Sequence, residues 1–302
     1  MAIELRHLRY IIAVAEEGHI TRAAERLGIQ QPPLSRQIKA IEREIKVQLF
    51  RRMPRGVELT DAGAAFLDGA RSMLSNLDQT LESTRRTARG EQGRLCVGLT
   101  PTAPFHPLVP RAIRAFRDAF PLVSVTLEES LSSELLERMR DDRMDVGFIR
   151  SSVADLENLV IHPLLDEAMV VALPSGHVLA DGNMAVSLKH LAGETFILYG
   201  PPGSGIYDST IAACRAAGFS PRIGQQAPRI TSTLSLVAAG LGISLVPASL
   251  QRMNMDGVTY RRIKGIVPKA ILSLASRRGD ASAVVRQFVT LVKRTAKKSS
   301  ND

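Results

Sequence analysis

The spacing of apolar residues changes once along this chain of 302 residues, and that change constrains the fold more than any other feature. Up to residue 89 the apolar residues recur mainly at helical spacing. After Gly90 and Gly93, short runs of β-branched and apolar residues alternate with helical patterns. A helical part followed by an alternating part predicts separate domains, and two or three domains of roughly 100–200 residues also fit the length.

Residues 21–45 show the pattern of two helices joined by a tight turn. Thr21 is predicted to cap the first helix, and Gly28 is predicted to end it. Two prolines follow, and proline suits a first helical turn because its missing N–H would have no partner there. The second helix is predicted over residues 32–45 from apolar residues at 4-3-4 spacing, which are Leu34, Ile38, Ile41 and Ile45.

The exposed positions of the second helix match what the major groove of DNA offers. Arginine pairs with guanine, glutamine with adenine, and lysine or serine with phosphates or base edges. A basic hairpin is predicted over residues 50–59, where a wing would reach phosphates or the minor groove. An ordinary solvated pair of basic helices is the alternative. The residues expected to contact DNA are Thr21, Gln31, Pro32, Pro33, Ser35, Arg36, Gln37, Lys39, Arg51, Arg52 and Arg55.

A long helix is predicted over residues 60–89, capped by Thr60 and with Asp61 at its positive end. A stripe of mostly apolar residues runs along it at a spacing close to that of a coiled-coil heptad. A second copy of the chain is the simplest partner for such a stripe, and packing on its own domain is the alternative. The stripe consists of Phe66, Ala70, Met73, Leu77, Leu81, Thr84 and Ala88.

The remaining residues predict layers of parallel strands and helices, because the two patterns alternate along the chain. The expected strands cover residues 95–99, 123–127, 146–149, 169–173, 195–198, 243–246 and 271–274. The expected helices cover residues 108–120, 134–140, 206–217 and 234–239.

The sequence lacks the motifs that are typical of disulfide-rich folds, metal sites and common enzyme families. Cys96 and Cys214 are too few for a disulfide framework or a structural zinc site, and no two histidines stand at helical spacing. P-loop, nucleophile-elbow and dinucleotide-binding motifs are missing too. We therefore expect no enzymatic activity, no metal and no cofactor.

No segment has the composition of a membrane span or a signal peptide. The longest uncharged stretch, residues 230–251, contains two glycines, a proline and several hydroxyl residues. The apolar run near the N-terminus is interrupted by arginine and ended by Glu16 and Glu17. We expect a cytoplasmic protein with no membrane partner.

A family resemblance covers the whole chain. The segment TRAAERLGIQQPPLSRQIKAIEREIKVQLFRRMPRGVELTDAG resembles the N-terminal domain of LysR-type transcriptional regulators, and LVAAGLGISLVPASL resembles their effector domain. Within that family the chain is similar to the muconate-responsive regulators of aromatic-compound degradation. It departs from the family pattern at Gln30, where serine usually caps the reading helix, and at Ile45 and Lys46, where Leu-Gly usually ends it.

The resemblance implies an α/β effector domain with two Rossmann-like lobes, like a periplasmic binding protein, behind an all-α winged helix-turn-helix domain and a long linker helix. The expected boundaries are 1–59 for DNA binding, 60–89 for the linker and dimerisation helix, and 90–302 for effector binding. Within the last, lobe I covers about 93–162 and 268–302, and lobe II about 163–267.

The implied function is sequence-specific transcriptional regulation, switched by an aromatic-pathway or dicarboxylate-type metabolite between the lobes. The implied partners are double-stranded promoter DNA, a carboxylate-bearing effector, RNA polymerase and further copies of the chain, assembled as a dimer of dimers. The alternative is a cytoplasmic solute-binding sensor protein whose basic helices serve another partner.

Polar residues stand where a cleft between the lobes would bind a ligand. Two threonines follow the first strand at its carboxyl end, and two serines precede a helix whose free N–H groups suit a carboxylate. A donor-rich loop at 200–205 precedes another helix, and Arg150 matches an arginine of effector sites in the resembling branch. A plain helix cap is the alternative for the serines, and a surface salt bridge is the alternative for Arg150. The expected effector residues are Thr100, Thr102, Ser132, Ser133, Arg150, Pro202, Gly203, Ser204 and Tyr207.

The formal net charge of +9 is unevenly distributed. Residues 22–55, around the predicted reading helix and wing, hold 9 basic and 3 acidic residues. Residues 261–302 hold 11 basic and 2 acidic residues, although they lie far along the chain from that helix. The second surplus is either a solvated helix face or a second patch near bent DNA.

Overall fold

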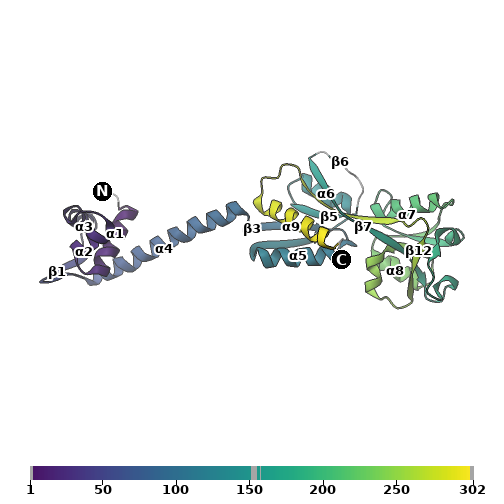
Figure 1. Ribbon diagram of the computed structural model, residues 1–302, viewed down its shortest axis with the longest axis horizontal. Coiled ribbons are helices and arrows are strands. Elements are labelled where there is room, and N and C mark those ends of the chain that lie inside the picture. The colour runs from purple at the N-terminus through teal and green to yellow at the C-terminus, as the bar shows by residue number, and fades with distance from the viewer. Residues whose placement is uncertain (1–2, 151–154, 157, 300–302) are drawn as a thin grey trace. The chain divides into compact units, whose positions relative to one another are not determined.

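The computed structural model describes residues 3–150, 155–156 and 158–299, and the chain divides into two compact units, 1–86 and 87–302. Helix α4 (Asp61–Arg89) runs from the first unit into the second (Figure 1).

The first unit is a three-helix core with a hairpin. Helices α1 (Leu5–Glu17), α2 (Ile20–Leu27) and α3 (Gln31–Ile45) bury one apolar cluster, in which the small Ala23 and Ala24 pack near Ile38 and Ile41. Small residues allow α2 to approach α3 closely, as the sequence suggested. The tight turn between them ends α2 at Gly28, whose φ of 68° is the left-handed conformation that favours glycine.

The cap of α2 differs from the prediction. The helix begins at Ile20, and the Nδ1 atom of His19 accepts a hydrogen bond from the main-chain N–H of Thr21 at 3.2 Å. Thr21 therefore lies in the first turn of the helix with its side chain exposed, and the cap assigned to it from sequence is wrong. Histidine was overlooked because serine, threonine, aspartate and asparagine are the usual caps.

Both departures from the family pattern around α3 have structural consequences. Gln30 precedes the helix without a capping hydrogen bond from its side chain. Lys46 ends the helix in the left-handed conformation, with φ 57°, at the position where glycine is the favoured residue. A lysine held there carries backbone strain that glycine would avoid.

The hairpin formed by β1 (Phe50–Met53) and β2 (Gly56–Leu59) is attached at two points. The carboxylate of Glu42 on α3 accepts hydrogen bonds from the main-chain N–H groups of Leu49 and Phe50, at 2.9 and 3.1 Å. At the other end, a Cβ on Gly56 would lie 2.2 Å from the carbonyl oxygen of Gly18, so only glycine fits the turn. These contacts give the wing a defined position on the three helices.

Helix α4 starts as the sequence predicted, because Thr60 Oγ1 accepts a hydrogen bond from the N–H of Gly63 at 2.9 Å. Its first turns bury Leu67 and Ala70. Farther along the helix, side chains of the stripe become exposed to solvent, and Met73 and Leu81 are 59% and 46% exposed.

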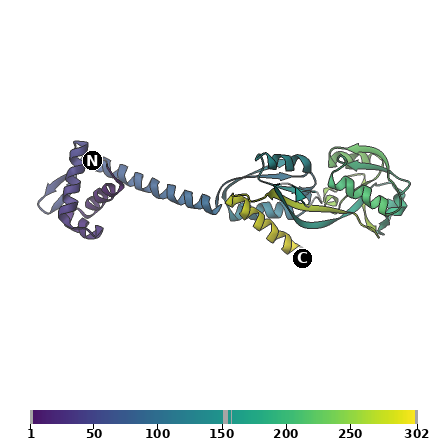
Figure 2. The same ribbon diagram turned by 90° about the horizontal axis from the view of Figure 1, so that it is seen from above.

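Lobe I of the second unit is a sheet between two helical layers. Its strands lie in the order β4 (Leu122–Glu129), β3 (Gln92–Leu99), β5 (Val146–Ile149), β13 (Lys269–Arg277), β7 (Leu159–Pro174). Helices α5 (Leu108–Ala119) and α9 (Ala283–Ser299) cover one face together, and α6 (Ser132–Arg140) covers the other (Figures 1 and 2). Phe288 of α9 packs edge-on against Phe116 of α5, with ring centroids 5.0 Å apart.

Lobe II is built around the far half of β7. That half pairs with β11 (Ser244–Pro247) and β12 (Val258–Lys264), and β12 pairs with β8 (Val186–Ser187). Strands β9 (Thr195–Tyr199) and β10 (Arg222–Ala227) form a parallel pair, and Phe196 of β9 forms a bridge with Ile243, the residue before β11. Helices α7 (Gly205–Ala216) and α8 (Ile230–Ala238) complete one apolar core with these strands.

The sheets are mixed rather than parallel, which corrects the expectation from the alternating pattern. Strand β7 leaves lobe I for lobe II and β13 returns, so the two necessarily run antiparallel. The pairing of β7 changes from β13 to β11 and β12 at residues 168–169, a few residues after the lobe boundary expected at about residue 162.

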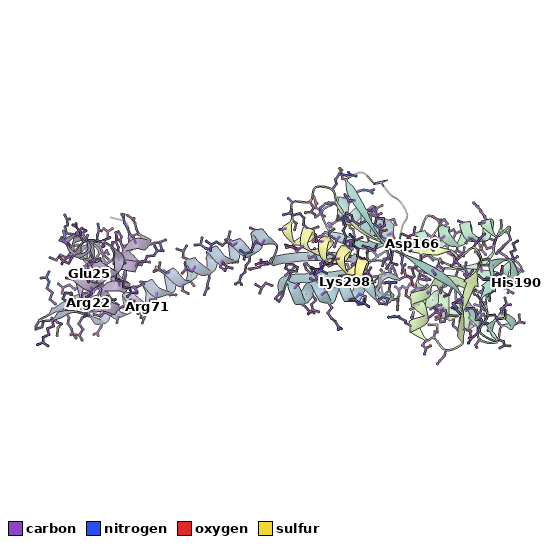
Figure 3. The ribbon with its side chains drawn as sticks, in the orientation of Figure 1. Arg22, Glu25, Arg71, Asp166, His190 and Lys298 are labelled. Atoms are coloured by element: carbon purple, nitrogen blue, oxygen red, sulfur yellow. The ribbon has the colours of Figure 1, made fainter. Side chains whose placement is uncertain are left out.

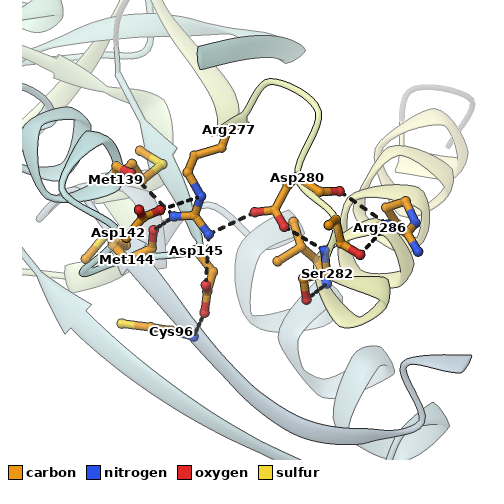
Figure 4. A network of polar contacts seen from close by, with 11 residues as sticks. Cys96, Met139, Asp142, Met144, Asp145, Arg277, Asp280, Ser282 and Arg286 are labelled. Carbon is orange, nitrogen blue, oxygen red and sulfur yellow. Dashed lines mark hydrogen bonds and ion pairs between the residues drawn. The ribbon is translucent and has the colours of Figure 1, made fainter. Parts of the chain in front are cut away.

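A polar network fastens the end of β13 (Figure 4). The guanidinium of Arg277 contacts the carboxylates of Asp142, Asp145 and Asp280, which come from the α6–β5 loop and from the segment before α9. Asp145 also accepts a hydrogen bond from the N–H of Cys96 on β3 at 2.7 Å. The network therefore joins α6, β3 and α9 around one arginine.

Candidate functional site: a basic helix and wing, and a cavity between two lobes

The second helix of the pair, α3, carries its polar residues on the exposed side. The side chains of Gln31, Pro32, Arg36 and Lys39 are exposed. Pro33, Ser35 and Gln37 are partly buried, and the Oε1 atom of Gln37 is buried without a hydrogen-bond partner among the described residues. A polar row of this kind on the second helix of a helix-turn-helix is what enters a major groove.

The wing adds exposed cations beside this helix. Arg52 and Arg55 are exposed, and no ion pair holds them within the part of the chain that the structure describes. Arg51 is also exposed, but its guanidinium pairs across the hairpin with Glu58 at 2.8 Å. An open groove of about 680 Å³ separates the wing from the end of α3. Its basic lining residues are Lys39, Arg43, Lys46, Arg51 and Arg52.

In the second unit, a small cavity lies where the two lobes meet. From lobe I it is lined by Thr100, Pro101, Thr102, Leu131, Ser132 and Arg150, and from lobe II by Tyr199, Gly200, Ser204, Gly205 and Ile206. Its volume is about 20 Å³, roughly the space of one water molecule. The side chains of the two lobes are thus nearly in contact.

Three buried polar atoms at this cavity have no hydrogen-bond partner among the residues that the structure describes. They are Thr100 Oγ1, Arg150 Nε and Ser204 Oγ, which come from both lobes. A buried polar atom without a partner costs about 1–3 kcal/mol, so such atoms are rare unless a ligand or water completes them. Their convergence marks the cavity as a place where a polar ligand would bind.

Two helices begin at the cavity. Helix α6 starts at Ser132 after Leu131, and α7 starts at Gly205 after Ser204, and neither preceding residue caps its helix through its side chain. Free N–H groups at a helix start, together with the helix dipole, favour an anion. Ser132 is no plain cap, because its Oγ accepts a hydrogen bond from the N–H of Arg150 at 3.2 Å.

Arg150 is held in a buried ion pair that the sequence did not predict. Its Nη2 atom lies 2.7 Å from Glu167 Oε2, and the two side chains are 4% and 6% exposed. Its Nη1 atom donates to the carbonyl oxygen of Ala270 at 2.9 Å. Burial lowers the pKa of Arg150, while the charge of Glu167 acts against that effect. The surface salt bridge considered from sequence is therefore replaced by an interior one.

The same pair connects the two lobes. Glu167 lies on β7 just before it enters lobe II, and its Oε1 atom accepts a hydrogen bond from the N–H of Ser249 at 2.6 Å. Ser249 belongs to the short helix η4 (Ala248–Met253) of lobe II. Arg150 therefore reaches the second lobe through Glu167, at the point where the chain crosses over.

Two further ionisable side chains near the pair were missed by sequence reasoning. Burial raises the pKa of Tyr199, which lines the cavity, to about 12, and the nearby charge of Glu129 adds to the shift. Burial lowers the pKa of His106, which interacts electrostatically with Glu167 and Arg150. Glu167 gave no distinct signal in the sequence, because it stands beside Asp166 in a half of β7 that also contains His162 and Pro163.

The other predicted effector residues lie elsewhere. Ser133, Pro202 and Gly203 are exposed and are not among the described residues that line the cavity. Tyr207 packs against the lobe II core and lines a different groove, of about 530 Å³, with Ile211 and Ile223. Thr100, Thr102, Ser132, Arg150 and Ser204 are brought together around the cavity.

The two cysteines are free thiols. Burial raises the pKa of each to about 11, and for Cys96 a hydrogen bond to Glu128 adds to the shift. Among the described residues, no group of three or more histidine, cysteine, aspartate or glutamate side chains is placed to hold a metal ion. Over the same residues, we find no helix long and apolar enough to cross a membrane.

Both units match known protein families. Residues 5–64 match the family described as bacterial regulatory helix-turn-helix protein, lysR family, and residues 88–297 match the family described as LysR substrate binding domain.

Individual relatives match over nearly the whole length. The HTH-type transcriptional regulator BudR of Raoultella terrigena is 36% identical over 290 residues, which cover 96% of this chain and 100% of BudR. The HTH-type transcriptional regulator CatR of Pseudomonas putida is 35% identical over 299 residues, covering 97% and 100%. The crystal structure of full-length CbnR in complex with its target DNA is similar with a TM-score of 0.86 and 32% identity, covering 97% and 100%.

Proposed function

This chain belongs to the LysR family of transcriptional regulators, and from that premise we propose that it recognises promoter DNA through α3 and the wing and is switched by a small carboxylate bound between the lobes of its second unit. The curated relatives named above are transcriptional regulators. We propose the same role here, as a cytoplasmic regulator and not an enzyme. The alternative, a solute-binding sensor protein, does not explain why residues 5–64 match a family of regulatory helix-turn-helix proteins.

In this proposal α3 reads bases and the wing holds the DNA backbone. Arg36 is the best candidate for a base contact, because it is exposed in the first half of α3 and has no ion-pair partner among the described residues. Arg52 and Arg55 then contact phosphates, which position the helix without carrying sequence information. Arg51 contributes less, because Glu58 already neutralises it. The CbnR structure, solved with its target DNA, supports the assignment by similarity.

We propose that the exposed stripe of α4 pairs with the same helix of a second copy. Met73 and Leu81 are 59% and 46% exposed, and they belong to the stripe whose spacing is close to that of a heptad. A second contact between effector units would make a dimer of dimers, and RNA polymerase is the expected partner at the promoter. A dimer also suits two-fold symmetric DNA sites.

The observation that carries the effector assignment is the set of three unpartnered polar atoms at the cavity between the lobes. The hydroxyls of Thr100 and Ser204 and the Nε–H of Arg150 would bond a carboxylate, and the starts of α6 and α7 supply a field that favours negative charge. Leu131 and Ile206 offer an apolar wall for the rest of the ligand. An aromatic or dicarboxylate metabolite matches this combination.

A cavity of about 20 Å³ holds no such metabolite, so the lobes have to separate for the ligand to bind. The hinge for this motion is the crossing point of β7 at residues 168–169 and the start of β13 at Lys269. A ligand that binds the separated form more tightly would shift the population toward it. This shift is the proposed signal to the DNA-binding unit.

The test is isothermal titration calorimetry of the full chain against benzoate-type and unsaturated dicarboxylate compounds. The double variant Thr100→Val with Ser204→Ala removes two unpartnered hydroxyls, so we expect unchanged or higher thermal stability but at least tenfold weaker binding. The matched control, Thr290→Val with Ser235→Ala, removes hydroxyls from exposed helix positions in the same two lobes. Normal binding by the first double variant would reject this site.

A further inference from the structure

The C-terminal helix α9 presents a face of uniform charge. Its apolar side is buried against the sheet and α5, through residues that include Phe288 and Val292. Every described charged residue on the helix is basic and exposed, and Figure 3 shows Lys298 near its end. The basic residues are Arg286, Lys293, Arg294, Lys297 and Lys298.

These cations are not neutralised within the described part of the chain. Arg286 donates to the main-chain oxygens of Asp280 and Ala281, at 3.2 and 2.7 Å, and not to a carboxylate. Lys293 and Lys297 form no ion pair among the residues that the structure covers. The positive charge on this face is therefore available to an external partner.

The neighbouring helix extends the charged surface. Helix α5 packs beside α9 on the same face of the sheet, and its Arg114 and Arg117 are also exposed, with Asp118 as a nearby acid. From Arg286 to Lys297 the row on α9 spans roughly 16 Å, the length of about five base-pair steps along one strand of a duplex. The spacing suits a series of phosphates.

We propose that the outward face of α9, defined by its five basic residues, binds the sugar–phosphate backbone of duplex DNA without reading its sequence. Charge complementarity favours a polyanion, and the face lacks the aromatic or large apolar side chains that anchor a protein partner. Lysine side chains neutralise phosphates as flexible point charges and need no defined base geometry. This second contact would give a role to five of the eleven basic residues in the segment 261–302.

The experiment compares two triple variants of the full chain, each of which lowers the net charge equally. The first, Lys293→Gln, Lys297→Gln and Lys298→Gln, changes the face of α9. The control changes three exposed basic residues of lobe II, Lys189→Gln, Arg262→Gln and Lys264→Gln. Binding to a long duplex of random sequence is measured by fluorescence anisotropy between about 50 and 200 mM salt.

The α9 variant should bind the random duplex more weakly, and the slope of log K against log salt should fall by about 0.9 for each lysine that contacts a phosphate. The control should keep the wild-type slope. Equal slopes for the α9 variant and the control would overturn the proposal, and would leave an acidic protein surface as the partner to test. Arg36→Ala should instead weaken binding to the promoter relative to random DNA. A failure of promoter recognition by α3 can therefore be distinguished from a failure of the α9 contact.

Discussion

Replacing Glu167 by alanine should destabilise the second unit strongly, because the change leaves a buried arginine without its counter-charge. The side chains of Arg150 and Glu167 are 4% and 6% exposed and are joined at 2.7 Å. Removing one partner of a buried pair costs about 3–5 kcal/mol. The N–H of Ser249, which bonds to Glu167 at 2.6 Å, loses its acceptor in the same step.

Scanning calorimetry of the full chain measures this cost. For a unit of this size each kcal/mol moves Tm by roughly 2–4 °C, so Glu167→Ala should lower the Tm of that unit by roughly 6–20 °C. The matched control is the double variant Arg150→Met with Glu167→Leu, which replaces both charges by apolar groups and should recover most of the loss. A loss below about 3 °C for Glu167→Ala would show that the buried pair does not hold Arg150 as described, and so would a double variant as unstable as the single one.

Three other predictions concern separate features. Arg36→Ala should weaken binding to the promoter by about 1–3 kcal/mol and leave binding to random DNA nearly unchanged, and equal losses on both duplexes in an anisotropy assay would contradict the base contact. Lys46→Gly should stabilise the first unit by about 1 kcal/mol in urea unfolding, because glycine adopts a φ of 57° without strain. Lys46→Ala should not stabilise it, and equal stabilities of the two variants would argue against strain at the end of α3. Alkylation of Cys96 and Cys214 at pH 8 should be at least roughly 100-fold slower than that of an exposed cysteine thiol, since a pKa of about 11 leaves little thiolate. Fast labelling of the native chain would show that the thiols are not protected.

The helix pair, the wing and the start of α4 were predictable from sequence because each rests on a local rule. Apolar spacing, a glycine in the left-handed conformation and a threonine cap act within a few residues. The cap of α2 is also a local feature, but the prediction was wrong because histidine, here His19, is an unusual acceptor at that position.

The pairing of the strands was not predictable from local pattern. Strand β10 (Arg222–Ala227) has three polar residues and is mostly exposed, and β12 (Val258–Lys264) carries three basic residues. Neither therefore resembles the apolar runs from which strands are predicted. The first half of β7 is interrupted by His162 and Pro163, which hid its continuity with the apolar run at 169–173. Mixed pairing follows from the chain crossing twice between lobes.

Only some of the contacts at the cavity could be predicted from the sequence. Thr100, Ser132 and Ser204 were found because strand ends and helix starts are where α/β folds place ligand contacts. The ion pair of Arg150 with Glu167, and the bond from Glu167 to Ser249, join segments that meet only after the lobes have formed. The local sequence pattern could not show which side chains these contacts bring together.

Regulation through the cavity is tested most directly by a hydroxyl-radical footprint of the full chain on the DNA upstream of its own gene, with and without a carboxylate that calorimetry shows to bind. We expect a protected site in both states and a change in its extent or affinity when the ligand saturates the cavity. The Thr100→Val, Ser204→Ala variant should protect the same site and lose the change. Identical footprints with and without saturating ligand on the wild-type chain would contradict regulation through the cavity.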